Sequence, residues 1–256
     1  NKAKHKVNLP PLKKQIEIDN ISFSYPESKS DVINKLTIKI DAKTSVAFVG
    51  STGAGKSTLI DIILGLLEPE KGFIKVDDVI LNKKNIKSWQ RSIGYVPQTI
   101  FIADDSIARN IALGSKKDEI DYAQIRKVAK LAKINEFIEK DLPFSYDTKV
   151  GEAGVKLSGG QRQRLGIARA LYRDPKVLIF DEATSALDNI TEQAIIDRIN
   201  SLKRSITLIM IAHRLSTIKN CDTIYHLENG KLRSYGTFAK LSETDELFRN
   251  MSSNFV

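Results

Sequence analysis

One short segment, a buried strand that runs into a glycine-rich loop, restricts the possible folds more than any other feature of this sequence. Residues 46–49 are apolar, and the loop Gly50-Ser-Thr-Gly-Ala-Gly-Lys56-Ser57 follows them directly. A helix is expected to begin near Thr58. The loop matches the pattern G-x-x-x-x-G-K-[ST], in which backbone N–H groups and a helix N-terminus surround a phosphate. The sequence therefore predicts a P-loop that binds a nucleotide.

The residues of this loop are expected to share the task of holding the phosphates. Its glycines let backbone N–H groups wrap the β-phosphate. Lys56 would reach the β- and γ-phosphates, and the Ser57 hydroxyl would bind Mg²⁺. The candidate binding residues of the segment are Gly50, Ser51, Thr52, Gly53, Ala54, Gly55, Lys56, Ser57 and Thr58.

A pair of acidic residues at the end of another buried strand supplies a second element. Residues 177–180 are apolar, and Asp181 and Glu182 follow them. A carboxylate in this position is costly to bury unless a cation or hydrogen bonds satisfy it. Asp181 can hold Mg²⁺, as the corresponding aspartate does in P-loop enzymes. Glu182 is a candidate to orient and deprotonate an attacking water.

The segment Leu157-Ser158-Gly159-Gly160-Gln161 indicates a second anion site. A serine and two glycines stand just before a helix that is expected to start around Gln161. Backbone N–H groups and one hydroxyl are therefore exposed at a helix N-terminus. The chain thus carries one complete phosphate-binding loop and one half-site.

Short apolar strands alternate with amphipathic helices along most of the chain. Residues 16–23 and 36–40 instead read as half-buried strands that follow one another, and Asn229-Gly230 predicts a hairpin between two later strands. The pattern predicts an α/β fold: the mostly parallel sheet core of a P-loop NTPase, with an N-terminal antiparallel β portion and a helical subdomain.

Taken in this order, the motifs resemble the nucleotide-binding domain of an ATP-binding cassette (ABC) transporter. The resemblance runs from about residue 16 to residue 248, with Leu157 to Gln161 as the signature motif. It implies that the nucleotide is ATP, that Mg²⁺ is the metal, and that the chain hydrolyses ATP to ADP and phosphate. Every catalytic motif position is intact, which predicts an active site rather than a degenerate one.

The resemblance also assigns roles that pattern and spacing alone do not. Tyr25 matches the aromatic residue that stacks on adenine, and Gln98 matches a glutamine that contacts Mg²⁺ and faces a transmembrane partner. Asp188 ends the segment that matches the D-loop, and His213 matches the histidine expected to contact the γ-phosphate. The resemblance therefore implies the catalytic residues Glu182, His213 and Lys56 and the metal ligands Ser57, Gln98 and Asp181.

The family pattern implies that two such domains meet head to tail. Ser158 and Gly160 of one copy would then close over ATP that Lys56 of the other copy holds. The expected partners are a second copy of the chain, in an ATP-dependent homodimer, and a transmembrane domain fused at the N-terminus. This places the domain at the cytoplasmic face of the inner membrane, as part of a membrane protein. No nucleic-acid partner is expected.

The region between Gln98 and the signature motif resembles the exporter type, in which it contacts the coupling helices of the membrane domain. Lys149 stands where exporters usually have Glu, and Ala153 where they often have Arg, so these departures concern the coupling contacts and not the ATP chemistry. The sequences of residues 104–107 with 110–112, and of residues 218–222, are similar to those of bacterial lipid-linked oligosaccharide flippases. The predicted function is therefore a motor domain that couples ATP hydrolysis to substrate movement across the membrane.

Four segments follow from this interpretation: a basic linker at residues 1–14, the first part of the ATP-binding core at 15–102, the helical subdomain at 103–157, and the second part of the core at 158–256.

Two further functional classes stay open. An import-system ATPase would bind separate membrane subunits, but many of those carry an extra C-terminal regulatory domain, and the basic N-terminal linker argues against this class. A cassette that acts on nucleic acid or ribosomes would show two cassettes per chain or a long inserted coiled coil, and neither is visible. A GTPase is disfavoured because Asn34-Lys35 and Asn82-Lys83 lack the aspartate of the guanine-reading motif.

Composition excludes other classes. A chain of 256 residues with 41% hydrophobic residues can bury a large core, which argues against disordered and disulfide-scaffold proteins. Cys221 is single, and no apolar run approaches the ~18–20 residues that span a bilayer. The formal net charge of +9 is concentrated in an N-terminal arm with Lys2, Lys4, Lys6, Lys13 and Lys14. This arm is either a contact for an anionic membrane or nucleic acid, or a solvated linker.

Overall fold

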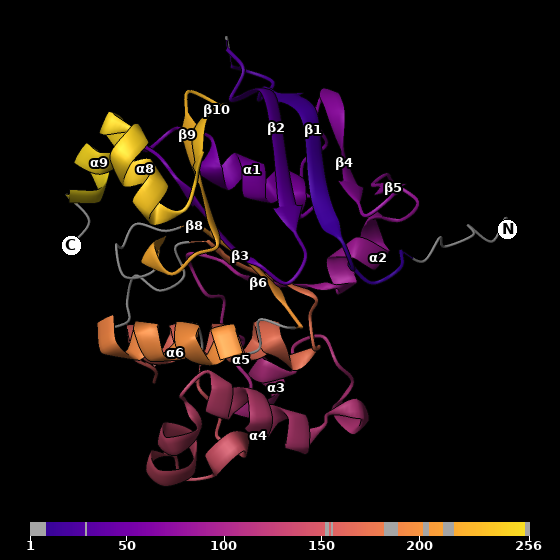
Figure 1. The fold of residues 1–256 in the computed structure, drawn as a ribbon. Coiled ribbons are helices and arrows are strands. Elements are labelled where there is room, and N and C mark those ends of the chain that lie inside the picture. Colours follow the sequence, from indigo (N-terminus) through magenta and orange to yellow (C-terminus); the bar gives the residue numbers. More distant parts are fainter. Residues whose placement is uncertain are drawn as a thin grey trace, which may run out of the picture. The chain divides into compact units, whose positions relative to one another are not determined.

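The computed structural model describes residues 9–28, 30–151, 154, 156–181, 189–201, 205–211 and 218–253. The chain divides into two compact units (Figure 1). The first unit combines residues 1–93 with residues 203–256, and the second unit comprises residues 94–202. No helix in the described ranges has the length and apolarity needed to cross a bilayer.

An antiparallel sheet in the first unit has the order β2-β1-β4-β5. Its strands are β1 (Gln15–Phe23), β2 (Ile33–Asp41), β4 (Lys71–Val76) and β5 (Val79–Ile80). Ile16 pairs with Ile40 on one side and with Val76 on the other, and all three side chains are buried. Alternate residues of β2 are buried and exposed, as expected for a sheet with one solvated face. The antiparallel portion that the sequence predicts near the N-terminus is confirmed.

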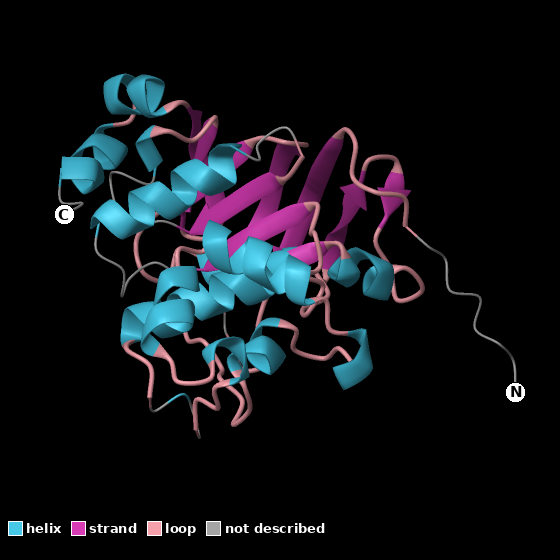
Figure 2. Ribbon diagram, turned by 90° about the horizontal axis from the view of Figure 1, so that it is seen from below, coloured by secondary structure: helices cyan, strands magenta, loops and turns pink. Residues whose placement is uncertain are grey.

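The P-loop strand of the first unit is β3 (Ser45–Val49), and all five of its residues are buried. It pairs in parallel with β8 (Thr207–Ile211) and with β9 (Thr223–Glu228), while β10 (Lys231–Gly236) pairs antiparallel with β9. The helices of this unit are α1 (Lys56–Ile63), α2 (Ile86–Arg91), α8 (Phe238–Thr244) and α9 (Glu246–Ser253). The last two lie beside the C-terminal label in Figure 2.

The second unit is mainly helical. Its helices are α3 (Ile107–Ile111), α4 (Tyr122–Leu131), α5 (Gly159–Tyr172) and α6 (Asn189–Ser201), and α5 contacts both α3 and α4. Its strands β6 (Ile93–Val96) and β7 (Val177–Asp181) are neighbours, and β7 is buried up to Phe180. Short single turns lie at Lys117–Glu119, Phe137–Asp141 and Ser145–Asp147. The predicted fold class, a P-loop α/β core with an antiparallel portion and helical elements, is confirmed, whereas the four segment boundaries stay a prediction.

Candidate nucleotide-binding site

The glycine-rich loop connects β3 to α1 in the first unit. Ser51, Thr52 and Gly53 are exposed, whereas Ala54 and Gly55 are buried. Helix α1 has no acidic residue in its first turn, and its N-cap, Gly55, offers no side chain to bond the first amides. The positive end of the helix dipole is therefore not neutralised by the helix itself, and the loop is suited to an anion.

Lys56 links the two ends of this loop. Its side chain is buried, and its ammonium group donates hydrogen bonds to the carbonyl oxygens of Gly50, at 2.8 Å, and of Ser51, at 2.9 Å. A buried ammonium group must be solvated by such acceptors to stay charged. The arrangement keeps a positive charge inside the loop, where the sequence predicts the β- and γ-phosphates.

Tyr25 lies beside the start of α1. Its ring packs edge-on against Phe23, with centroids 5.1 Å apart, and is 42% exposed. Its hydroxyl is 3.3 Å from Oγ1 of Thr58, the third residue of α1. The structure thus brings the predicted adenine-stacking residue next to helix α1 of the P-loop, with part of its aromatic side chain left accessible for a base.

Asp181 and Gln98 belong to the second unit. Asp181 ends β7 and is half-buried, and the Tyr95 hydroxyl donates a hydrogen bond to its Oδ2 at 3.2 Å. Gln98 lies two residues after β6 and is exposed. Lys56 and Ser57, in contrast, lie in the first unit.

The oxygen donors of the predicted metal ligands fit Mg²⁺. Ser57 offers a hydroxyl on an exposed residue, Gln98 an amide carbonyl and Asp181 a carboxylate. Mg²⁺ is a hard cation that prefers oxygen ligands and is usually bound by one or two carboxylates together with substrate phosphates. In the described part of the chain no group of three or more His, Cys, Asp or Glu side chains forms an alternative metal site.

Ser158 is the N-cap of α5. Its hydroxyl oxygen accepts a hydrogen bond from the Gln161 N–H at 3.2 Å, and the Ser158 N–H donates to Oε1 of Gln161 at 2.8 Å. This reciprocal capping box starts the helix at Gly159, two residues earlier than the sequence predicts. The Ser158 hydroxyl keeps its own proton to donate, and Ser158 is exposed, so the half-site remains suited to an anion.

Four positions predicted to act in ATP hydrolysis or coupling lie outside the described residues, as do Lys2, Lys4 and Lys6 of the N-terminal arm. The four are Glu182, Asp188 and His213 of the candidate site and Ala153 of the exporter-type loop. Lys149, the other departure from the exporter pattern in that loop, is exposed, and its backbone forms an isolated antiparallel β-bridge with Ser106.

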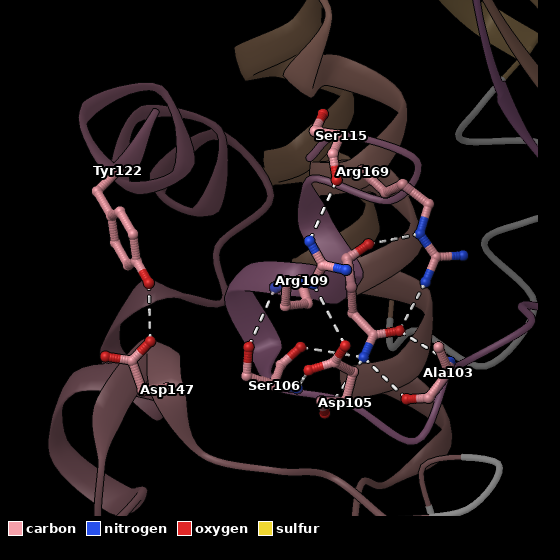
Figure 3. Close-up of polar contacts among 9 residues, drawn as sticks. Ala103, Asp105, Ser106, Arg109, Ser115, Tyr122, Asp147 and Arg169 are labelled. Atoms are coloured by element: carbon pink, nitrogen blue, oxygen red, sulfur yellow. Dashed lines mark hydrogen bonds and ion pairs between the residues drawn. The ribbon is translucent and has the colours of Figure 1, made fainter. Parts of the chain in front are cut away.

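Arg169 is a residue that the sequence analysis does not single out. It lies on α5, and Figure 3 shows its guanidinium group reaching the loop at Ala103. The group donates to the backbone oxygens of Phe101 and Asn110 and to Oδ1 of Asn110, at 2.6, 2.8 and 3.1 Å. Asn110 is fully buried and bonds the Ala103 backbone in both directions. The loop that follows Gln98 is therefore fastened to the signature helix.

The pKa values of two ionisable side chains in this cluster, Arg169 and Asp105, are lowered. Burial lowers the pKa of Arg169, although the group stays charged at neutral pH. The pKa of Asp105 is lowered, first because the Ser106 N–H donates to it at 2.7 Å and then because Arg109 donates at 3.3 Å. An arginine in an otherwise apolar stretch of α5 is the signal from which Arg169 could have been found.

A hollow of about 310 Å³ opens beyond the C-terminal end of α1, away from the P-loop. Its lining is mostly apolar and includes Ile62, Leu66 and Phe73. Its two charged side chains, Glu68 and Lys83, pair with each other at 3.1 Å. The hollow therefore lacks the cationic character of a phosphate site.

Comparison with known proteins agrees with this geometry. A family model described as ABC transporter matches residues 33–185. The chain is 43% identical to the heterocyst differentiation ATP-binding protein HepA of a Nostoc species, over 93% of the chain and 39% of HepA. It is 39% identical to the ATP-dependent lipid A-core flippase of Saccharophagus degradans, over 98% of the chain and 42% of the flippase.

A solved structure of a bacterial Atm1-family ABC exporter with ATP bound superposes with a TM-score of 0.91 and 38% identity. The match covers 97% of the chain and 43% of the exporter, so the chain spans well under half the length of these proteins. The P-loop, the Asp181 strand and the Ser158 helix are thus the parts of a known domain. The chain belongs to the ABC transporter family, as the ATPase domain of an exporter-type member.

Proposed function

We propose that this domain is the motor of an ABC exporter or flippase, which binds ATP on its P-loop and hydrolyses it as a head-to-tail homodimer. The observation that carries the proposal is the pair of anion sites: a P-loop with an internal ammonium group and an exposed, serine-capped helix N-terminus. One chain has a complete phosphate-binding loop and a half-site at the Ser158 helix. In a head-to-tail dimer each ATP would lie between the P-loop of one chain and the half-site of the other.

The residues of the first unit would bind the nucleotide. The adenine stacks on the accessible ring of Tyr25, and the phosphates lie on the amides of Ser51 to Ser57. The Lys56 ammonium group, which now bonds two carbonyl oxygens, turns to the β- and γ-phosphate oxygens. Thr58 closes the cradle beside the Tyr25 hydroxyl.

The residues around the γ-phosphate would then promote hydrolysis. Ser57, Gln98 and Asp181 would hold Mg²⁺, which supplies charge neutralisation on the β- and γ-phosphates when bound. Glu182 accepts a proton from the attacking water, His213 contacts the γ-phosphate, and Asp188 contributes at the dimer contact. Ser158, Gly159, Gly160 and Gln161 of the second copy bring a hydroxyl, amides and a helix dipole to the same phosphate.

The cargo class that we propose is a lipid-linked oligosaccharide. Support comes from residues 104–107 and 218–222 and from relatives that are named lipid A-core flippases. A transmembrane domain joined before the basic linker would carry the cargo, and the ATPase domain would work at the cytoplasmic face of the inner membrane. A transport assay of the full-length protein in proteoliposomes tests this: its ATPase activity should rise with a lipid-linked oligosaccharide and not with the same glycan free of lipid.

The homodimer is tested by the solution mass of Glu182→Gln, measured by light scattering after gel filtration. Removal of the general base should leave ATP binding intact and trap the dimer, so Mg-ATP should double the mass. The matched control is Lys56→Ala in the same background, which should stay monomeric because it lacks the phosphate contact. A protein that stays monomeric with ATP demonstrably bound contradicts the composite site.

A further inference from the structure

The P-loop is supported from behind by the turn between β9 and β10. The Gly230 N–H donates a hydrogen bond to the carbonyl oxygen of Ala54 at 3.2 Å, and the Gly230 oxygen accepts one from the Asn34 N–H at 2.9 Å. A single residue far along the chain therefore joins the phosphate-binding loop to the start of β2.

The support is tight as well as hydrogen-bonded. A Cβ atom on Gly230 would lie 2.3 Å from the carbonyl oxygen of Val32, and one on Gly55 would lie 2.9 Å from the same oxygen. The φ angles of Asn229 and Gly230 are 49° and 72°, as in the two-residue hairpin turns that favour Asn-Gly. Only glycine at position 230 combines this backbone conformation with such close approach.

The hydrogen bond from Gly230 sets the direction of an amide that the nucleotide needs. The Ala54 carbonyl and the Gly55 N–H belong to one peptide group, which is planar and trans, so they point in opposite directions. Because the carbonyl points to the hairpin, the N–H points away from it. Among the described residues no acceptor is bonded to the Gly55 N–H.

The strands that flank the Asn229-Gly230 turn are themselves held by contacts with β3 and with the segment between α8 and α9. His226 of β9 pairs with Val49, the residue just before the P-loop, and its Nδ1 is 2.8 Å from Oδ2 of Asp245, between α8 and α9. Both side chains are buried. Arg233 joins β10 to β9 through Glu228 at 2.6 Å. The C-terminal helices therefore fix where the turn meets the loop.

We propose that Gly230 is a positioning residue for ATP, which aims the Gly55 amide at the bound phosphates. The proposal rests on the assignment of the P-loop to ATP in the proposed function. It predicts that the hairpin affects the phosphates of the nucleotide and not the base, which Tyr25 contacts.

The test compares Gly230→Ala with Asn229→Gly, which keeps the turn conformation and removes an exposed side chain. Affinities are measured by calorimetry for ATP and for tripolyphosphate, which has no base. Loss of one aimed hydrogen bond should weaken both ligands about tenfold in Gly230→Ala, whereas Asn229→Gly should bind both like the wild type. Weakening of ATP alone, or of neither ligand in a folded variant, overturns the proposal.

If Gly230→Ala does not fold, amide hydrogen exchange of the wild-type protein tests the proposal without the variant. The Gly230 N–H should be protected like the strand amides beside it, and tripolyphosphate should increase the protection of Gly55. Free exchange of Gly230 overturns the proposal. A wild-type protein that binds neither ATP nor tripolyphosphate refutes the proposed function, and the inference with it, whereas normal wild-type binding with an unaffected Gly230→Ala refutes the inference alone.

Discussion

Lys56 illustrates how single residues of this domain serve both the loop and its ligand. Its ammonium group donates hydrogen bonds to the carbonyl oxygens of Gly50 and Ser51. The loop therefore solvates the positive charge that is expected to neutralise the phosphates of ATP. Binding of a phosphate then requires the ammonium group to exchange these carbonyl acceptors for phosphate oxygens.

Replacement of Lys56 by Ala should therefore weaken ATP binding strongly. We expect the dissociation constant to rise by about one to two orders of magnitude, since a charge-assisted contact to a phosphate contributes roughly 1.5–3 kcal/mol. Titration of a fluorescent ATP analogue measures it. Lys83→Ala is the matched control, because Lys83 is exposed and pairs with Glu68 on the surface. An unchanged dissociation constant in a folded Lys56→Ala protein contradicts the assigned role.

Sequence reasoning at this scale succeeds for residues whose chemistry is local. The loop from Gly50 to Ser57 is contiguous, and Ser158 stands next to the amides that it caps. Gly230 and Arg169 act on partners far away along the chain, Ala54 and the loop around Ala103. Their partners follow from strand order and helix packing, which a pattern of residue types does not contain.

Elements of the fold were predictable where hydrophobic periodicity is strong. The buried strands β3 and β7 and the hairpin of β9 and β10 lie where the sequence predicts them. Helix α1 ends at Ile63, because Gly65 follows its C-cap with a φ of 68°. The helices α2, α8 and α9 are not predicted, since each is short and gains its stability from packing.

The capping residue of α5 can be separated from its proposed role at the phosphate. Ser158 caps α5 and Thr237 caps α8, each accepting a bond from the N–H three residues on. Ser158→Ala and Thr237→Ala should each lower the free energy of unfolding by about 1 kcal/mol in urea titrations. In the Glu182→Gln background only Ser158→Ala should also lose the ATP-dependent dimer. Equal dimer formation by both variants would show that Ser158 acts only as a cap.

The contact between the hairpin and the C-terminal helices should give the stability an acid dependence. Burial acts to raise the pKa of Asp245, but hydrogen bonds from Ser234, His226 and the Phe248 N–H outweigh it and lower the pKa below 3.8. A carboxylate with a lowered folded-state pKa stabilises the protein fully above the unfolded pKa, about 3.9, and loses this effect as the pH falls toward the folded value.

Replacement of Asp245 by Asn should therefore lower the free energy of unfolding by about 2 kcal/mol at pH 7. The difference from the wild type should shrink below about pH 4. Urea unfolding at pH 7 and at pH 3.5 measures both effects. Asp78→Asn is the control, since Asp78 is exposed and pairs with Lys14 at the surface. An equal loss at both pH values would mean that the charge of Asp245 does not matter.

The whole domain has its two anion sites on different units: the P-loop on the first, and the capped N-terminus of α5 on the second. In the proposed head-to-tail dimer each ATP is enclosed by the P-loop of one copy and the α5 N-terminus of the other. This has a consequence for mixtures of variants, because the two halves of one site then come from different chains.

Two inactive variants should therefore restore activity when they are mixed. Lys56→Ala removes the phosphate contact of a chain's own P-loop, and Ser158→Arg blocks the α5 N-terminus that the chain offers to its partner. In a mixed dimer one site carries both defects and the other carries neither. Each mixed dimer should then contain one intact site, whereas neither variant alone can form one. ATP hydrolysis by the mixture should exceed the mean of the two variants measured alone. Activity equal to that mean contradicts head-to-tail pairing, because a site built within one chain cannot be repaired by a second chain.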